Sequence, residues 1–241
     1  MTRESELELL AAGARDLGIA LEPPRVEELL RLVDALELGN AQFNLTAIRD
    51  RLGMLRKHVL DSLSLQPYLR GTRIADIGTG SGAILLALLS ELPKATGIGT
   101  DISLMALQAA NHNAARFGLA PRTAFVVCNY ASALSGMFDL IVSNPPYIRS
   151  ADIAGLELEV REYDPPGALD GGVDGLDAYR AIVPQAASLL APGGTLIVEA
   201  GCGQSGSIAD LMSASGLTSE RLPKTDLAGI PRAIAGRKPP R

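Results

Sequence analysis

Strand and helix patterns alternate along this chain from Arg73 onwards, and that alternation most constrains the fold. Short apolar runs predict strands at 73–77, 96–100, 123–127, 138–143 and 195–200, with two further short candidates near the C-terminus. Helical periodicity covers 83–92, 104–117, 178–190 and 207–215. Alternating strands and helices favour a mostly parallel sheet that helices cover on both faces. We therefore expect an α/β fold with a Rossmann-like, seven-stranded, mostly parallel sheet.

The first seventy residues carry helical patterns alone. Helices are predicted at Glu6–Leu17, from Pro23-Pro24 to about Gly39, and at Arg51–Leu65. The second has one apolar face, made of Val26, Leu29, Leu30, Val33 and Leu36. We expect two domains. One is a small helical cap at 1–70, which is a candidate for substrate recognition, and the other is a catalytic domain at 71–241.

Composition narrows the class of protein. The 241 residues are 47% hydrophobic and 20% charged, as in ordinary globular proteins, and the net charge of −5 argues against tight binding of naked nucleic acid by the whole domain. The N-terminus does not resemble a signal peptide, and no apolar run reaches the roughly 18 residues that span a bilayer. We expect a cytoplasmic protein that does not bind membranes.

The cysteines and histidines have no spacing typical of a metal site or a disulfide framework, so we expect no metal. Cys128, at a strand end, is predicted to be a small buried hydrophobic residue. The basic C-terminus, with Arg237, Lys238 and Arg241, is predicted to be a solvated tail.

A glycine-rich loop, Asp76–Gly82, follows the first strand of the alternating region. Glycines at a strand end let the backbone approach a ligand closely. The third glycine of the dinucleotide fingerprint is absent from its place, and Asp76 would repel a pyrophosphate. Both features favour a cationic cofactor such as a nucleoside sulfonium, and they make a nicotinamide dehydrogenase a distant alternative.

Polar side chains also follow the next two strands. Asp101 ends the second strand and is predicted to accept hydrogen bonds from ribose hydroxyls; the alternative, a helix N-cap, suits Ser103 better. Asn129 is predicted to form a hydrogen bond with the adenine amine, and Tyr130 is predicted to pack on the adenine ring. The alternative is that 128–130 form an ordinary loop without a role in binding. The predicted cofactor-binding residues are Asp76, Gly78, Thr79, Gly80, Gly82, Asp101, Ile102, Asn129, Tyr130 and Asn144.

The segment Asn144-Pro145-Pro146-Tyr147 follows the fourth strand. Two prolines stiffen the backbone and remove two N–H donors, which leaves carbonyls as acceptors. The Asn144 side chain adds another acceptor and Tyr147 adds a flat aromatic face. Together they suit an –NH2 group on a planar body, either an amide or a base amine. We predict Asn144, Pro145 and Tyr147 as catalytic, with Pro146 completing the substrate site.

The segment from Arg149 to Gly175 is predicted to be a long functional loop that closes over the substrate. Glu159, Glu162 and Asp164 are candidates for substrate contacts, although a solvated acidic loop explains them nearly as well.

The sequence resembles the HemK-type protein-(glutamine-N5) methyltransferases. The resemblance depends on the glycine-rich loop Asp76–Gly82, Asp101, Asn144–Tyr147 and the stretch Ala168–Arg180. That resemblance covers about Arg73 to Arg237. It implies S-adenosylmethionine as cofactor and the glutamine of the Gly-Gly-Gln motif in peptide chain release factors as substrate.

The sequence departs from the family pattern in three places. Asn129 stands where the family usually has an acidic residue, and Asp164-Pro165 replaces Glu-Pro. The proline-rich segment before the catalytic domain is absent, and Phe43–Asp50 and Lys57–Leu63 are similar to an rRNA guanine-N7 methyltransferase family instead. An rRNA or DNA methyltransferase acting on a base amine therefore stays as the alternative, followed by a non-catalytic binding domain.

Overall fold

The computed structural model describes residues 2–43, 50–60, 71–156, 165–219, 224–225 and 231–240. The chain divides into two compact units. One comprises 1–69 with 225–230, and the other 70–224 with 231–241. Each unit is described below by itself.

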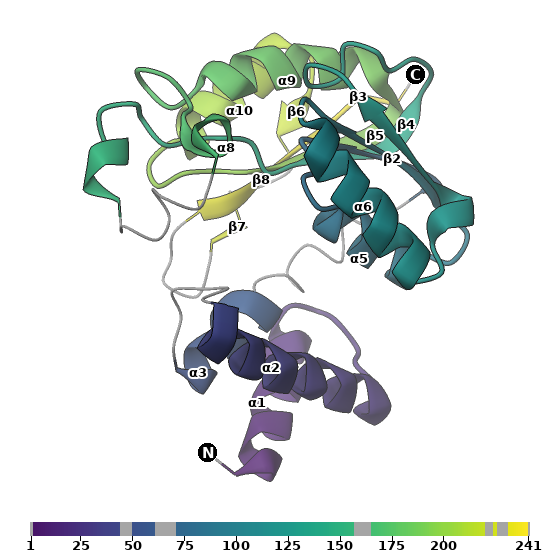
Figure 1. Cartoon of the computed structure of the whole chain (residues 1–241), viewed down its shortest axis with the longest axis vertical. Helices are drawn as coiled ribbons and strands as arrows, with labels where there is room; N and C mark the ends of the chain where they lie inside the picture. The colour runs from purple at the N-terminus through teal and green to yellow at the C-terminus, as the bar shows by residue number, and fades with distance from the viewer. Residues whose placement is uncertain are drawn as a thin grey trace. The chain divides into compact units, whose positions relative to one another are not determined.

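The larger unit is built on one sheet (Figure 1). Its strands are β1 (Arg73–Ile77), β2 (Thr96–Asp101), β3 (Thr123–Val127), β4 (Phe138–Ser143), β5 (Leu190–Glu199), β6 (Thr218–Ser219), β7 (Lys224–Thr225) and β8 (Pro231–Arg237). The order is β3-β2-β1-β4-β5-β8-β6, and β7 also pairs with β8. The five strands β1 to β5 run parallel, while β8 is antiparallel to β5 and β6. The predicted mostly parallel sheet is confirmed.

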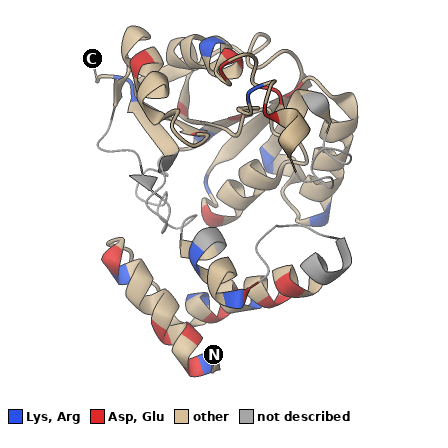
Figure 2. Cartoon of the chain, turned by 90° about the vertical axis from the view of Figure 1, so that its left-hand side faces the viewer, with Lys and Arg blue, Asp and Glu red and all other residues tan. Residues whose placement is uncertain are grey.

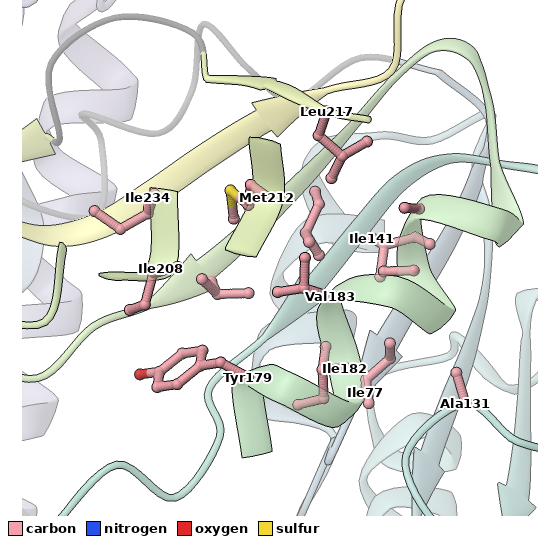
Figure 3. Packing of buried hydrophobic residues seen from close by; sticks show 14 of the residues in the cluster. Ile77, Ala131, Ile141, Tyr179, Ile182, Val183, Ile208, Met212, Leu217 and Ile234 are labelled. Carbon is pink, nitrogen blue, oxygen red and sulfur yellow. The ribbon is translucent and has the colours of Figure 1, made fainter. Parts of the chain in front are cut away.

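Helices cover both faces of this sheet. α5 (Ala83–Glu91) and α6 (Leu104–Arg116) lie on one face, and α9 (Asp177–Leu189) and α10 (Ser205–Ala214) on the other (Figure 1). Figure 3 shows Ile182 and Val183 of α9 packed with Ile77 of β1 and Ile141 of β4. All four side chains are buried, so apolar burial fixes α9 on the sheet.

Connections between strands add short helices: η3 (Ala120–Arg122) before β3, and η4 (Ile153–Gly155) and α8 (Pro166–Leu169) between β4 and α9. The described parts of the segment predicted as a long loop therefore contain short helices. Ile148 and Asp170 form a parallel bridge, with Ile148 N–H donating to Leu169 O over 3.0 Å. Glu159, Glu162 and Asp164 lie outside the described residues.

Two details at the C-terminal side differ from the sequence-based expectation. β5 begins at Leu190, before the predicted turn, because 191–194 form a bulge: Leu190 pairs with Phe138, and pairing resumes at Thr195 with Leu140. Of the residues predicted to form a solvated tail, Arg237 and Lys238 have defined contacts, and Arg241 lies outside the described residues. Arg237 ends β8, and the Lys238 ammonium donates to two carbonyls at the end of α9, Ala187 O and Leu190 O, both at 2.8 Å.

The smaller unit is helical, as predicted. It contains α1 (Arg3–Asp16), α2 (Pro23–Phe43), α3 (Arg51–Met54) and the π-helical turn η1 (Leu55–Leu60). α2 continues past Gly39, where the sequence indicated its end. The buried residues from these elements are Leu10, Val26, Leu30, Val33, Met54, Leu55, Val59 and Leu60. The apolar face predicted for α2 thus forms much of this core.

Among the described residues, no helix is long and apolar enough to cross a membrane.

Candidate active site

The strand register brings the glycine loop and the Asn144 segment together. Ile77, the last residue of β1, pairs with Ser143, the last residue of β4, and the Ser143 hydroxyl donates to Ile77 O over 2.7 Å. The chain continues from these neighbours into the glycine loop on one side and Asn144 on the other. This is the point where the sheet order reverses, where ligands of open α/β sheets bind.

Hydrogen bonds to β2 fix the glycine loop. Thr79 N–H donates to Thr100 O over 2.8 Å, and Gly80 N–H donates to the Asp101 carboxylate over 2.9 Å. Gly78 and Gly80 both have positive φ, and nothing lies within 4 Å of a Cβ built on either. The loop therefore presents bare backbone to open space. Gly82 differs, because it is buried against Ala110 of α6 and precedes the first turn of α5.

Asp76 lies beneath the loop rather than on its surface, with 1% of the residue exposed. One carboxylate oxygen accepts from the Thr79 hydroxyl over 2.6 Å and from Leu85 N–H over 3.2 Å. The other, Oδ1, is buried without a protein partner. Burial raises the pKa of the Asp76 carboxyl to about 6, against the lowering effect of those hydrogen bonds. The sequence indicated Asp76 as a residue beside the ligand; in the structure its carboxylate lies beneath the glycine loop and contacts Thr79 and Leu85.

Asp101 is half-buried, and two backbone donors orient its carboxylate. Oδ2 accepts from Gly80 N–H and Oδ1 accepts from Ser103 N–H over 2.8 Å. The N-cap of α6 is Ser103, whose hydroxyl accepts from Ala106 N–H, as the sequence indicated. Ile102, beside Asp101, is 75% exposed.

The residues after β3 lie beside Asp101. Val127 pairs with Asp101, and Cys128 N–H donates to Asp101 O over 3.0 Å. Asn129 is exposed, and Tyr130 is half-buried with φ of 51°, the left-handed region that bulky residues rarely adopt. Cys128 is half-buried rather than buried as predicted, and its thiol donates to Tyr130 O over 3.2 Å.

In the segment Asn144–Tyr147 the first side chain is exposed, while Tyr147 is held by contacts with the end of β5 and with Gln204. Asn144 is exposed, Pro145 is buried, and Pro146 and Tyr147 are half-buried. The Tyr147 hydroxyl donates to the Glu199 carboxylate over 3.1 Å, where β5 ends. Gln204 donates to Tyr147 O over 2.9 Å. The predicted site residues thus gather at the carboxyl edge of β1 to β4, and Glu199 and Gln204 join them without having been predicted.

The stretch 168–180 runs beside the Asn144 segment. Gly171 N–H donates to Ile148 O over 2.8 Å, and Ser150 N–H donates to Gly172 O over 3.0 Å. Arg180 bridges Asp174 and Asp177 and so holds the turn that enters α9. Val173, within this turn, is 89% exposed.

Comparisons with known proteins identify the fold. A family model described as the methyltransferase small domain matches residues 56–157. A methyltransferase from Pyrococcus furiosus shares the fold, with a TM-score of 0.58 and 18% identity over 88% of this chain and 98% of that one.

Sequence relatives are more specific. A release factor glutamine methyltransferase of Bradyrhizobium diazoefficiens is 66% identical over 184 residues, which are 76% of this chain and 62% of that protein. Another, of Caulobacter vibrioides, is 38% identical over 252 aligned residues, covering 96% of this chain and 87% of that protein. The chain spans between half and two thirds of the length of several curated relatives that it matches. Its sequence and fold place it in the release factor glutamine methyltransferase family.

Proposed function

We propose that the chain transfers a methyl group from S-adenosylmethionine to the side-chain amide nitrogen of a glutamine, in the Gly-Gly-Gln motif of peptide chain release factors. The observation that supports this proposal is the register of Ile77 with Ser143, which brings the glycine loop and the Asn-Pro-Pro-Tyr segment to neighbouring positions at the carboxyl edge of the sheet. The relatives' name supplies the substrate. The proposal implies a cytoplasmic location.

The loop residues suit this cofactor. Gly78 and Gly80 leave open space in front of the backbone, as a bulky adenosyl group requires. Two backbone N–H groups hold the Asp101 carboxylate, which would accept hydrogen bonds from the ribose hydroxyls. The buried Asp76 carboxylate, with Oδ1 lacking a protein partner, would supply a negative field below the loop. Ile102, Asn129 and Tyr130 would line the adenine side. When bound, S-adenosylmethionine supplies an electrophilic methyl group on a cationic sulfur.

Residues 144–147 prepare the substrate nitrogen. An amide nitrogen is a weak nucleophile, because its lone pair is delocalised into the carbonyl. The Asn144 side-chain oxygen and the Pro145 carbonyl accept its two N–H groups, which draws electron density onto nitrogen and stabilises the charge that develops there. Tyr147 stacks on the planar amide and orients the lone pair. The nitrogen loses one proton in the reaction, and water takes it, so no strong base is needed.

The test is incubation of the purified chain with methyl-labelled S-adenosylmethionine and, in separate reactions, bacterial release factors and 16S rRNA. Labelling of a release factor, with binding that depends weakly on salt, supports the proposal. Labelling of rRNA alone, with affinity that falls steeply as salt rises, would instead support the base-amine alternative.

A further inference from the structure

Gln204 connects three parts of the larger unit through one side-chain amide. Its nitrogen donates to Tyr147 O over 2.9 Å and to Gly175 O over 3.2 Å. Its oxygen accepts from Gly201 N–H over 3.0 Å. The amide thereby joins the Asn-Pro-Pro-Tyr segment, the turn that enters α9 and the end of β5.

The base of this side chain is rigid. Gln204 is the N-cap residue of α10, and its carbonyl accepts from Ile208 N–H over 3.0 Å. Ile208 and Met212 of α10 are fully buried in the core shared with α9 and β8 (Figure 3). Because Gln204 is fixed at this helix end, the packing of the core determines where its amide holds the backbone of Tyr147, Gly175 and Gly201.

The backbone packs closely around the side-chain amide of Gln204. A Cβ on Gly201 would lie 2.6 Å from the Gln204 oxygen and 3.0 Å from Tyr147 Cδ2. A Cβ on Gly175 would lie 2.5 Å from Tyr147 O. Glycines therefore allow the three backbone segments to converge on one amide, which has donors for two carbonyls and an acceptor for one N–H.

We propose that Gln204 is a positioning residue, which fixes the backbone of Tyr147 so that the ring and the Pro145 carbonyl face the substrate amide correctly. This inference rests on the proposed function for its substrate. The Tyr147 ring has a separate attachment through its hydroxyl to Glu199, so Gln204 acts on the backbone and Glu199 on the ring. Displacements of about 1 Å at such a segment lower turnover about a hundredfold.

The test compares Gln204→Glu and Gln204→Met with the wild type. Gln204→Glu keeps the size and the acceptor but removes both donors, while Gln204→Met removes donors and acceptor. Gln108→Glu, on the exposed surface of α6, makes the same chemical change away from the site and serves as the control. For each protein we would measure kcat and KM for release factor, the Kd for S-adenosylmethionine, Tm, and hydrogen exchange across 144–152.

We expect kcat to fall at least tenfold in both Gln204 variants, with faster exchange of the Ile148 and Ser150 amides, while Kd for the cofactor stays within about twofold. Wild-type kcat in Gln204→Glu would overturn the inference, as would a loss of cofactor affinity that matches the loss of kcat. If the wild type itself leaves release factors unlabelled, the proposed function has failed. Hydrogen exchange then decides whether Gln204 fixes the segment: faster exchange in the variants supports it, and unchanged exchange contradicts it.

Discussion

At the scale of single residues, Asn144 is the most informative position, because it is exposed and its replacement should therefore change stability little. Asn144→Ala should lower kcat by a hundredfold or more, since losing one preorganised hydrogen-bonding group removes about 2.7–4 kcal/mol of transition-state stabilisation. Cofactor binding should be retained. Steady-state kinetics and calorimetry check both, with Asn111→Ala on α6 as the control. Loss of cofactor affinity instead would show that Asn144 holds the cofactor rather than the substrate.

Asp76 leads to a pH-dependent prediction. The pKa of the Asp76 carboxyl is about 6 in the folded chain and about 4 in the unfolded chain. Between these pH values the folded chain holds a proton that the unfolded chain has released. The ionised carboxylate therefore destabilises the apo fold above pH 6, and this effect disappears as the pH falls below about 4.

Asp76→Asn should accordingly have a Tm at pH 8 equal to or above that of the wild type, with a difference that shrinks toward pH 5. Its affinity for S-adenosylmethionine at pH 8 should fall about tenfold, because the negative field below the loop is lost. Wild-type affinity should likewise weaken as the pH drops through 6. Thermal denaturation and calorimetry across pH 5–8 provide the data, and a pH-independent affinity in the wild type would contradict the assigned role.

At the scale of elements, the turn 171–175 depends on glycine for close contact with the Asn144 segment. Gly175 has φ of 77°, and a Cβ there would meet Tyr147 O. Gly175→Ala should lower both Tm and kcat, because backbone strain and displacement of Tyr147 occur together. Gly167→Ala in α8, where nothing lies within 4 Å of the new Cβ, should leave kcat unchanged. Equal kinetics for the two variants would argue against this contact.

Sequence reasoning predicted the elements well where one physical signal dominates. β1, β3 and β4 begin and end at the predicted residues, because an apolar run bounded by turn residues has few alternatives. α2 passes Gly39 because a single glycine in a helix costs only about 1 kcal/mol. The basic C-terminus looked solvated, yet Lys238 bonds carbonyls of α9 that are about fifty residues distant in sequence.

The sequence predicted that the candidate site residues gather at one edge of the sheet, but it did not predict the contacts that support them. Glycines, Asp101 and Asn144 follow predicted strands, and parallel strand ends meet at one edge. Gln204 has no such signal, since it lies in a glycine-rich turn and bonds Tyr147 O, 57 positions away. Such backbone contacts follow from tertiary packing, which a local pattern does not encode.

At the scale of the whole molecule, the two units have separate cores and separate sources of stability. In the smaller unit, acidic and basic residues lie along α1 and α2 (Figure 2). Arg51 of α3 contacts the buried Glu6 of α1 through two hydrogen bonds, of 2.5 and 2.9 Å, and also contacts Asp34 and Glu37 of α2. One guanidinium therefore links three helices.

Arg51→Gln should destabilise the smaller unit by about 3 kcal/mol, because the buried Glu6 carboxylate loses its hydrogen-bonded partner and keeps only the more distant Arg3, at 3.9 Å. The Arg51 hydrogen bonds lower the pKa of Glu6, so this stabilisation is present above about pH 4.5 and is lost as the pH falls further. Hydrogen exchange should accelerate in 3–60 and stay unchanged in β1 to β5. Uniform acceleration across both units would show that they unfold together. Arg25→Gln, whose exposed pair with Glu28 contributes little, is the control.

The proposed function requires that the methyl group reach the side-chain nitrogen of the Gly-Gly-Gln glutamine. Tandem mass spectrometry of a release factor treated with the chain and labelled S-adenosylmethionine tests it most directly. We expect one added methyl group on that glutamine, formed at least about a hundredfold more slowly with Asn144→Ala. Methylation at any other residue, or of RNA alone while the cofactor is bound, would contradict it.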